Sequence, residues 1–273
     1  MTAELSVATS ADPLVLYGQT FESRLLLGTS RYTSPRVLEA AVREAKPAML
    51  TASLRRQNIS ATDAPTNNRF WEMLHELKVP VLPNTAGCHS IQEVITTAHM
   101  AREVFATSWI KLELIGDDYT LQPDTLNLVE AASQLIKDGF KVLPYCTEDL
   151  VVCQRLVDVG CQAIMPWAAP IGTGKGPINA YALRTLRERL SVPMIVDAGL
   201  GLPSHACQVM EWGFDGVLLN TAVALAQDPV TMAGAFARAT QAGRDAFRSG
   251  AMREQQSAQP STPVLGTPFW HQA

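Results

Sequence analysis

A lysine and a glutamate stand two residues apart, at Lys111 and Glu113, within the strongly apolar segment Trp109–Ile115. If this segment is a β-strand, alternate side chains point to opposite faces, so the two charged groups share one face. Burial lowers the pKa of an amine, while a carboxylate nearby raises it again. An amine that is partly neutral near pH 7 can attack a carbonyl carbon and form an imine, with a neighbouring acid or base moving the protons. A buried ion pair that only fills the interior is the alternative, and these two residues alone do not decide between the two.

A second chemical signal follows the apolar run 192–196, where Asp197 precedes the sequence AGLG at 198–201. A later apolar run ends in Asn220-Thr221. In many α/β barrels the loops after the seventh and eighth strands hold a phosphate, because glycine lets backbone N–H groups approach it and a helix N-terminus favours negative charge. Asp197 is then expected at the rim of that site as a second general acid or base, with Ser204 capping the next helix. A turn-forming or capping aspartate, with glycines that only form turns, is the alternative.

Three further motifs carry weaker signals. The glycine-rich segment 170–176 lacks the residues of a nucleotide-binding loop, because Ala169 stands where that motif needs glycine and Gly176 where it needs serine or threonine. It indicates a flexible anion-binding lid or a plain surface loop. Arg55-Arg56 follows the second predicted strand, where it contacts phosphate or a partner, or is a solvated pair. The five histidines show no metal-ligand spacing, so we expect no bound metal.

Short apolar runs rich in Val, Ile and Leu alternate with longer amphipathic ones, the pattern of parallel strands joined by helices. Eight strands are predicted, at Glu22–Thr29, Ala48–Leu54, Val79–Thr85, Trp109–Ile115, Lys141–Cys146, Ala163–Pro170, Pro193–Gly199 and Gly216–Thr221. Eight strands close a barrel, so the predicted fold class is α/β, a single (β/α)8 TIM barrel. The loops after the carboxyl ends of its strands build the active site, which is where the polar residues above fall.

Composition agrees with one large globular unit. Apolar residues make up 47% of the chain and charged residues 18%, which excludes wholesale disorder. The net charge of −4 provides no global basic field, so neither nucleic-acid nor membrane-surface binding is expected. Five cysteines without a C-x-x-C pair and an N-terminus without a leader pattern favour reduced thiols and a cytoplasmic location. We expect a flexible extension over 1–13, the barrel over 14–247 and a mobile tail over 248–273.

A resemblance to a known family adds to this interpretation. It rests on FESRLLLGTSRY (21–32), LPNTAGCHS (82–90), IKLELIGD (110–117), LPYC (143–146), APIGTGKG (169–176), VDAGLGLPSHA (196–206) and NTAVALAQDPVTMA (220–233). Together these stretches resemble the bacterial thiazole synthases of thiamin biosynthesis, collinearly from about Leu14 to Gly243. The sequence departs from the family pattern at Trp167 and at Lys175, beside the sixth predicted strand.

The resemblance implies a complete reaction without a metal or redox cofactor. Lys111 is the implied Schiff-base lysine for 1-deoxy-D-xylulose 5-phosphate, and Glu113 and Asp197 are the implied acid/base groups. The implied binding residues for the sugar phosphate are Gly172, Ala198, Gly199, Asn220 and Thr221. The imine passes through an enol tautomer to a ketone one carbon along. The C-terminal thiocarboxylate of a small ubiquitin-like sulfur-carrier protein then attacks, water leaves, and dehydroglycine from a separate producing enzyme closes the thiazole ring. Homo-oligomerisation is also implied.

Two other functions remain open from the residues. The first is another imine-forming barrel, such as an aldolase that cleaves a sugar phosphate without any sulfur carrier. The second is a non-catalytic scaffold that only docks the carrier. The joint presence of Lys111, Glu113 and Asp197 argues against the scaffold.

Overall fold

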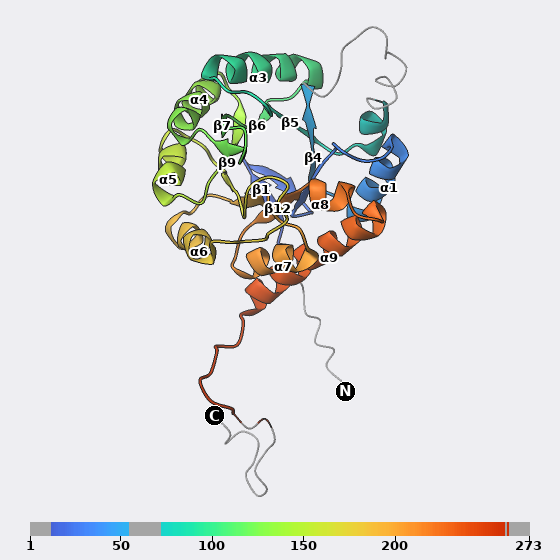
Figure 1. Ribbon diagram of the computed structural model, residues 1–273, viewed down its shortest axis with the longest axis vertical. Coiled ribbons are helices and arrows are strands. Elements are labelled where there is room, and N and C mark those ends of the chain that lie inside the picture. The colour runs from blue at the N-terminus through green and yellow to red at the C-terminus, as the bar shows by residue number, and fades with distance from the viewer. Residues whose placement is uncertain (1–11, 55–71, 260, 262–273) are drawn as a thin grey trace, which may run out of the picture.

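The computed structural model describes residues 12–54, 72–259 and 261, and it shows a ring of parallel strands surrounded by helices (Figure 1). The eight strands of the described sheet lie in the order β10-β9-β6-β5-β4-β3-β12-β11. Parallel bridges from Ile164 to Met194 and from Trp167 to Asp197 join the two outer strands and close the ring. The predicted (β/α)8 TIM barrel is therefore confirmed.

The barrel strands are β3 (Leu25–Gly28), β4 (Met49–Ser53), β5 (Val81–Asn84), β6 (Trp109–Leu112), β9 (Lys141–Cys146), β10 (Met165–Pro166), β11 (Ile195–Asp197) and β12 (Gly216–Leu219). The helices described in full are α1 (Pro35–Ala45), α3 (Ile91–Phe105), α4 (Thr125–Lys137), α5 (Leu150–Asp158), α6 (Ala180–Arg189), α7 (Pro203–Glu211), α8 (Thr221–Ala224) and α9 (Pro229–Ser249). Each predicted strand range contains one barrel strand.

Most observed strands are shorter than the predicted ranges, and in one case the difference affects the candidate site. The expected strand Trp109–Ile115 ends as β6 at Leu112, and Ile115–Asp117 forms a separate strand, β7, which pairs antiparallel with β8 (Gln122–Pro123). Apolar alternation continues through Ile115, so the sequence pattern does not mark this end. Glu113 consequently lies beyond the strand that carries Lys111.

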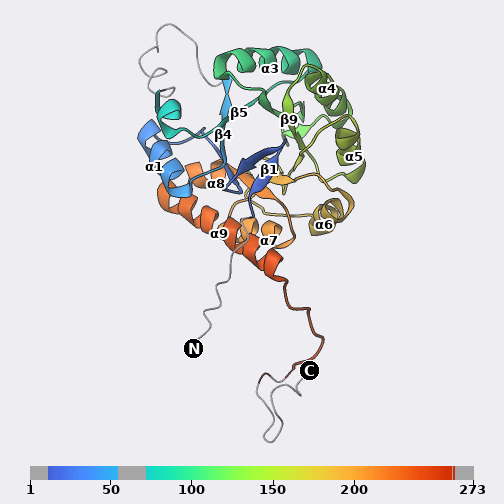
Figure 2. The ribbon, with the colours of Figure 1, turned by 180° about the vertical axis from the view of Figure 1, so that it is seen from behind.

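A short hairpin that the sequence analysis did not predict covers the amino-terminal end of the barrel. It consists of β1 (Leu14–Leu16) and β2 (Gln19–Phe21), and Figure 2 shows β1 lying across that end. Its apolar side chains are buried against the barrel side chains nearest the amino ends of the strands: Leu14, Leu16 and Phe21. The hairpin therefore buries apolar surface that the amino ends of the strands leave open.

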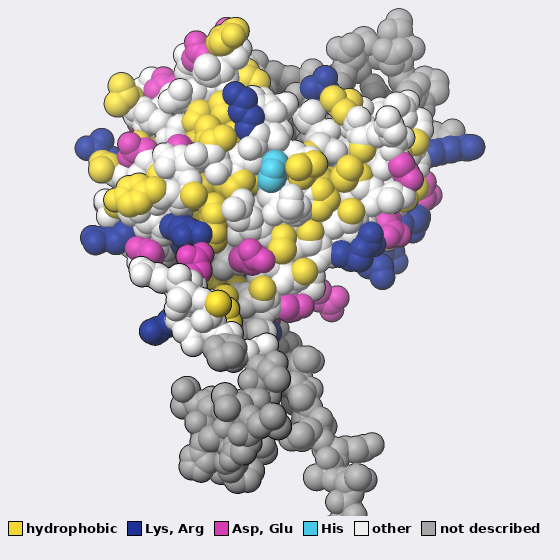
Figure 3. Space-filling view, turned by 60° about the horizontal axis from the view of Figure 1, so that its bottom comes forward, with side chains coloured by type: hydrophobic (Ala, Val, Ile, Leu, Met, Phe, Trp, Pro, Cys, Tyr) yellow, Lys and Arg dark blue, Asp and Glu magenta, His cyan; other side chains and the backbone are white. Residues whose placement is uncertain are grey.

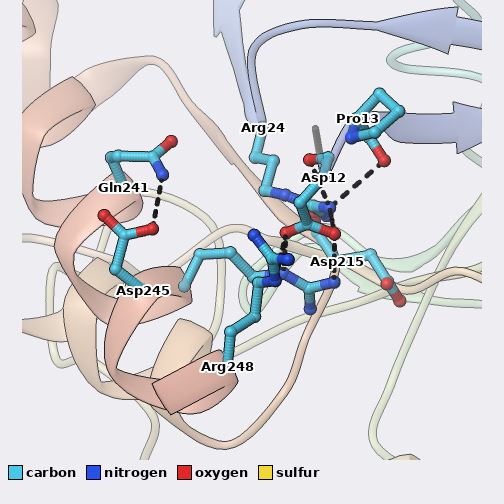
Figure 4. A network of polar contacts seen from close by, with 8 residues as sticks. Asp12, Pro13, Arg24, Asp215, Gln241, Asp245 and Arg248 are labelled. Atoms are coloured by element: carbon cyan, nitrogen blue, oxygen red, sulfur yellow. Dashed lines mark hydrogen bonds and ion pairs between the residues drawn. The ribbon is translucent and has the colours of Figure 1, made fainter. Parts of the chain in front are cut away.

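A charged cluster fastens this end of the molecule to the last helix (Figure 4). Arg24 is 5% exposed and donates to the backbone oxygens of Asp215, Asp12 and Pro13 at 2.7, 3.0 and 3.2 Å. The carboxylate of Asp12 also accepts two bonds from Arg244 in α9, at 2.7 and 3.1 Å. We call Asp12, Arg24 and Arg244 the basal cluster. It joins residues 232 positions apart in the sequence, so it fixes the start of the described chain to α9.

The face of the molecule around α6, α7 and α9 carries no field of one sign. Figure 3 shows the side of the barrel around α6, α7 and α9, where basic, acidic and apolar side chains are interspersed. This distribution agrees with the small net charge of −4. Among the described residues, no helix is long and apolar enough to cross a membrane.

Candidate active site

Three charged side chains meet inside the carboxyl end of the barrel. Lys111 Nζ lies 3.1 Å from Glu113 Oε1 and 2.5 Å from Asp197 Oδ2. Lys111 lies in β6, and Glu113 directly follows the end of that strand. Asp197 ends β11, so its contact with Lys111 requires the closed ring. All three are nearly inaccessible, at 6%, 7% and 4% exposed. The structure therefore brings the three predicted acid/base and nucleophilic groups together, although they are 86 positions apart at the extremes.

The electrostatics of this triad favour a charged lysine. Burial lowers the pKa of Lys111, but the negative charges of Asp197 and Glu113 outweigh it, and the net pKa is raised. Burial raises the pKa of Asp197, and the neighbouring Lys111 offsets part of that rise. The two opposing effects on the pKa of Lys111, which the sequence left undecided, therefore favour the charged ammonium form. Before it can attack a carbonyl, this amine must transfer a proton to a neighbour.

The triad lies in a cavity of about 890 Å³ at the carboxyl ends of the strands. A cavity of this size accommodates a phosphorylated sugar together with a second reactant. Every residue predicted for the site lines it: Lys111, Glu113, Gly172, Asp197, Ala198, Gly199, Asn220 and Thr221. The lining also includes polar residues that the sequence analysis did not single out, namely Thr29, Ser30, Arg31, Thr51, Ser53 and Asn84. These lie in, end or follow β3, β4 and β5, and their only sequence signal is their place near the carboxyl ends of these strands.

Two backbone segments pack directly against each other on one wall of the cavity. Gly199 has φ of +75°, and a Cβ there would lie 2.5 Å from Ala169. A Cβ on Gly201 would lie 2.4 Å from the carbonyl oxygen of Gly174. Gly176 N–H also donates to Gly199 O at 2.8 Å. The glycines of segments 170–176 and 198–201 therefore permit a close approach that larger residues would prevent, beyond serving as turn residues.

The helix after β11 is capped differently from the prediction. Its N-cap is Leu202, so Ser204 lies inside α7 and the predicted serine cap is wrong. Instead, His205 Nδ1 accepts bonds from the backbone N–H groups of Gly201 and Leu202 at 3.2 and 3.3 Å. This is the backward half of a capping box, made by the third helical residue, and the serine pattern hid it. The imidazole holds the wall segment next to Gly176, whose Cβ would lie 2.9 Å from the ring.

Asn220 is held between two neighbouring strands. Its Nδ2 donates to Ser30 Oγ at 2.6 Å, and a Cβ on Gly28 would lie 2.6 Å from the Asn220 side chain. The loops after β3 and β12 are thereby joined at the cavity wall. Thr221 begins α8 directly afterwards.

The comparisons with known proteins agree with one another. Residues 15–263 match the family described as thiazole biosynthesis protein ThiG. The chain belongs to this family. It is similar to the thiazole synthase of Variovorax paradoxus (strain S110), with 81% identity over 262 residues that cover 96% of each chain. It is also 68% identical to the thiazole synthase of Cupriavidus taiwanensis, over 99% of this chain and 97% of the relative. These matches place the chain among the thiazole synthases, enzymes of thiamin biosynthesis.

A solved structure provides a more distant match to the ThiG-family barrel. It is the crystal structure of the Amycolatopsis orientalis BexX/CysO complex, with a TM-score of 0.79 and 27% identity. The match covers 90% of this chain and 100% of that chain. The barrel is thus shared beyond the close relatives.

The remaining motifs lie outside the centre of this ThiG-family site. Trp167 packs edge-on against Tyr145, with ring centroids 6.5 Å apart, and its Nε1 donates to Glu148. Among the described residues, neither Trp167 nor Lys175 lines the cavity: Trp167 is buried, whereas Lys175 is exposed to solvent. His89 does line it, and its Nε2 lies 3.5 Å from Asp118 Oδ1. Arg55-Arg56 falls outside the described residues. No group of three metal-ligating side chains occurs in the part of the chain described here.

Proposed function

We propose that this thiazole synthase joins 1-deoxy-D-xylulose 5-phosphate to Lys111 as an imine and builds the thiazole phosphate on that adduct. The observation that carries the proposal is a buried amine between two carboxylates, at 2.5 and 3.1 Å, facing a cavity of about 890 Å³. A structural ion pair needs no such cavity. An amine that faces one can reach the carbonyl carbon of a bound ketose.

Proton transfer within the triad would supply the nucleophile. Asp197 Oδ2 is the nearer acceptor, and its raised pKa makes it a better base than an exposed carboxylate. Once the proton has moved, the neutral amine attacks the ketone carbon, the carbinolamine loses water, and the Nζ–carbon double bond forms. Glu113, 3.1 Å from Nζ, would protonate the departing hydroxyl of the carbinolamine as the imine forms, and would then move protons during the tautomerisation that shifts the carbonyl one carbon along.

The wall segments would hold the phosphate group. Ala198 and Gly199 both have positive φ, at +63° and +75°, and they directly follow Asp197. With Gly172 and the Asn220-Thr221 turn, they line the same cavity as the triad. Backbone N–H groups in such glycine-rich turns bind phosphate oxygens well, because no Cβ blocks their approach.

The other reactants would enter by the same end of the barrel. We infer that the C-terminal thiocarboxylate of a small ubiquitin-like sulfur carrier reaches the adduct through the loops after the strands, and that dehydroglycine then completes the ring. The similarity to a structure solved as the BexX/CysO complex supports a protein partner. Site-directed crosslinks from the carrier tail should map to loops such as 170–176, and crosslinks confined to the β1–β2 end would refute this route.

The decisive experiment is intact mass spectrometry after incubation with 1-deoxy-D-xylulose 5-phosphate and borohydride. The wild type should gain the mass of one reduced adduct, which peptide mapping should place on Lys111. Lys111→Arg keeps a positive charge but cannot form the imine, so it should gain nothing. Lys137→Ala removes an exposed lysine at the end of α4 and should behave as the wild type. An adduct on another residue, or product formation with Lys111 unmodified, would contradict the proposal, and cleavage of the sugar without a carrier would indicate an aldolase.

A further inference from the structure

Thr85 directly follows β5 and has no exposed surface. Its hydroxyl donates to the backbone oxygen of Glu113 at 2.7 Å and accepts from the backbone N–H of the same residue at 2.8 Å. A hydroxyl has one donor and two acceptor positions, so it can make both bonds at once. One side chain therefore fixes both backbone polar groups of a residue in the triad.

The main chain explains why a side chain is needed there. β5 and β6 pair at Asn84 and Lys111, and the N–H of Thr85 donates to Lys111 O at 3.2 Å. The carbonyl of Thr85 instead accepts from Cys88 N–H at 3.2 Å, because the chain turns away after β5. The hydroxyl takes the place of that carbonyl and receives the N–H of Glu113. Thr85 thus extends the pairing of the two strands by two residues beyond Lys111.

This extension matters because Glu113 lies past the end of β6. The bonds that its backbone makes to Thr85 tie Glu113 itself to the end of β5, while Ile115, two residues further on, donates its N–H to Cys88 O at 2.9 Å. Glu113 Oε1 is 3.1 Å from Lys111 Nζ, a contact that a backbone displacement of about 1 Å would break. Misplacement of a reacting group on this scale can lower a rate by about 100-fold.

We propose that Thr85 is a positioning residue for the reaction: its hydroxyl holds Glu113 where the carboxylate can transfer protons at the Lys111 imine. This inference rests on the proposed function, because it assigns Thr85 to the chemistry of that adduct. It predicts an effect on the rate of imine formation at saturating substrate, and little effect on binding of the sugar phosphate, whose predicted ligands lie on other loops.

The test compares Thr85→Val with Thr85→Ser. Valine keeps the shape and removes the hydroxyl, whereas serine keeps the hydroxyl and removes a methyl group. Thr240→Val is the matched control, because the Thr240 hydroxyl is also buried and also donates to a backbone oxygen, that of Phe236 in α9, at 2.8 Å. Borohydride trapping against time, at a series of sugar phosphate concentrations, separates the maximal rate of adduct formation from the half-saturating concentration.

Thr85→Val should lower the maximal rate roughly 10- to 100-fold and leave the half-saturating concentration within a factor of about three. Thr85→Ser should restore most of the rate, and Thr240→Val should retain it. If the valine variant does not fold, Thr85→Cys replaces it, because a thiol is a weak donor and acceptor and should give an intermediate rate.

Three results would overturn the inference: an unchanged maximal rate in Thr85→Val, a loss confined to the half-saturating concentration, or an equal loss in Thr240→Val. Where Thr85→Cys is used in place of Thr85→Val, a maximal rate equal to that of Thr85→Ser would likewise show that the hydroxyl has no positioning role. Absence of an adduct in the wild type would instead overturn the proposed function, and this inference with it, so the two failures are distinguishable.

Discussion

The two ends of the barrel each hold a cluster of charged side chains, and the two clusters have opposite composition. At the carboxyl end, one cation, Lys111, lies between two carboxylates. At the amino end, one carboxylate, Asp12, lies between Arg24 and Arg244. The pKa of Asp197 is raised, by burial above all, whereas the pKa of Asp12 is lowered, chiefly by its hydrogen bond from Arg244. The two clusters therefore shift the pKa of an aspartate in opposite directions.

The cations differ for a physical reason. A guanidinium stays charged at any ordinary pH and matches a carboxylate with a planar pair of donors, which suits a permanent fastening. An amine can lose its proton and become a nucleophile, which suits a site that must change state. The amino-terminal cluster is closed by backbone carbonyls, while the triad faces a cavity. The comparison teaches that buried charge alone does not indicate a catalytic site, whereas a labile charge buried beside a cavity supports the proposal of one.

The largest expected effect comes from making the same substitution, Asp to Asn, at each of the two aspartates. Asp197→Asn should lower the rate of adduct formation by about 10²- to 10⁴-fold, because the amide cannot accept the proton of Lys111. Asp12→Asn should leave that rate within a factor of about two, since the two sites share no partner. Borohydride trapping of both variants measures the contrast. Equal losses in the two variants would mean that the triad is structural.

A smaller effect is expected from substituting one glycine by alanine at each end of the barrel. Gly199→Ala places a Cβ 2.5 Å from Ala169 in the cavity wall, so it should weaken sugar phosphate binding at least tenfold and destabilise the fold by a few kcal/mol. Gly139 has a similar positive φ, at +83°, but a Cβ added there would meet no atom within 4 Å. Gly139→Ala should therefore cost only about 1 kcal/mol of backbone strain. Thermal unfolding and a binding isotherm for the sugar phosphate check both. Equal affinities in the two variants would show that the wall does not bind phosphate.

The smallest effect concerns stability at the amino-terminal end. Asp12→Ala should lower the free energy of unfolding at pH 7 by about 1 to 3 kcal/mol, because it removes the carboxylate that accepts two bonds from Arg244 and pairs with Arg24. The folded pKa of Asp12 lies below its ordinary value, which is near 4. Its contribution is therefore complete above about pH 4 and is lost as the pH falls through the lowered folded pKa. Denaturant titrations of the wild type and variant should converge at low pH, and a difference that grows on acidification would contradict this sign.

The sequence predicted most of the fold and all of the triad, for local reasons. Alternation in Trp109–Ile115 correctly directed Lys111 and Glu113 to one face, and the position of Asp197 at the end of an apolar run directed it to the active end. What it could not give were features that depend on chain closure. The contact between Lys111 and Asp197 exists because β10 and β11 complete the ring.

Three other features were missed because the sequence carries a misleading local signal for them, or none. A serine one residue away concealed the His205 cap, since capping by the third helical residue is less distinctive than an N-cap serine. The end of β6 was misplaced because its apolar pattern continues past Leu112. The basal cluster had no local signature at all, because arginine and aspartate far apart in the chain resemble any other surface charges.

The β1–β2 hairpin imposes an order of events on the proposed reaction. Because Leu14, Leu16 and Phe21 close the amino-terminal end, the interior has its entrance at the strand carboxyl ends. A protein tail inserted there obstructs whatever lies deeper. If the proposed carrier tail enters there, the small phosphorylated ketose would load first and the finished heterocycle would leave only after the tail withdraws, so withdrawal of the carrier would set an upper limit on turnover.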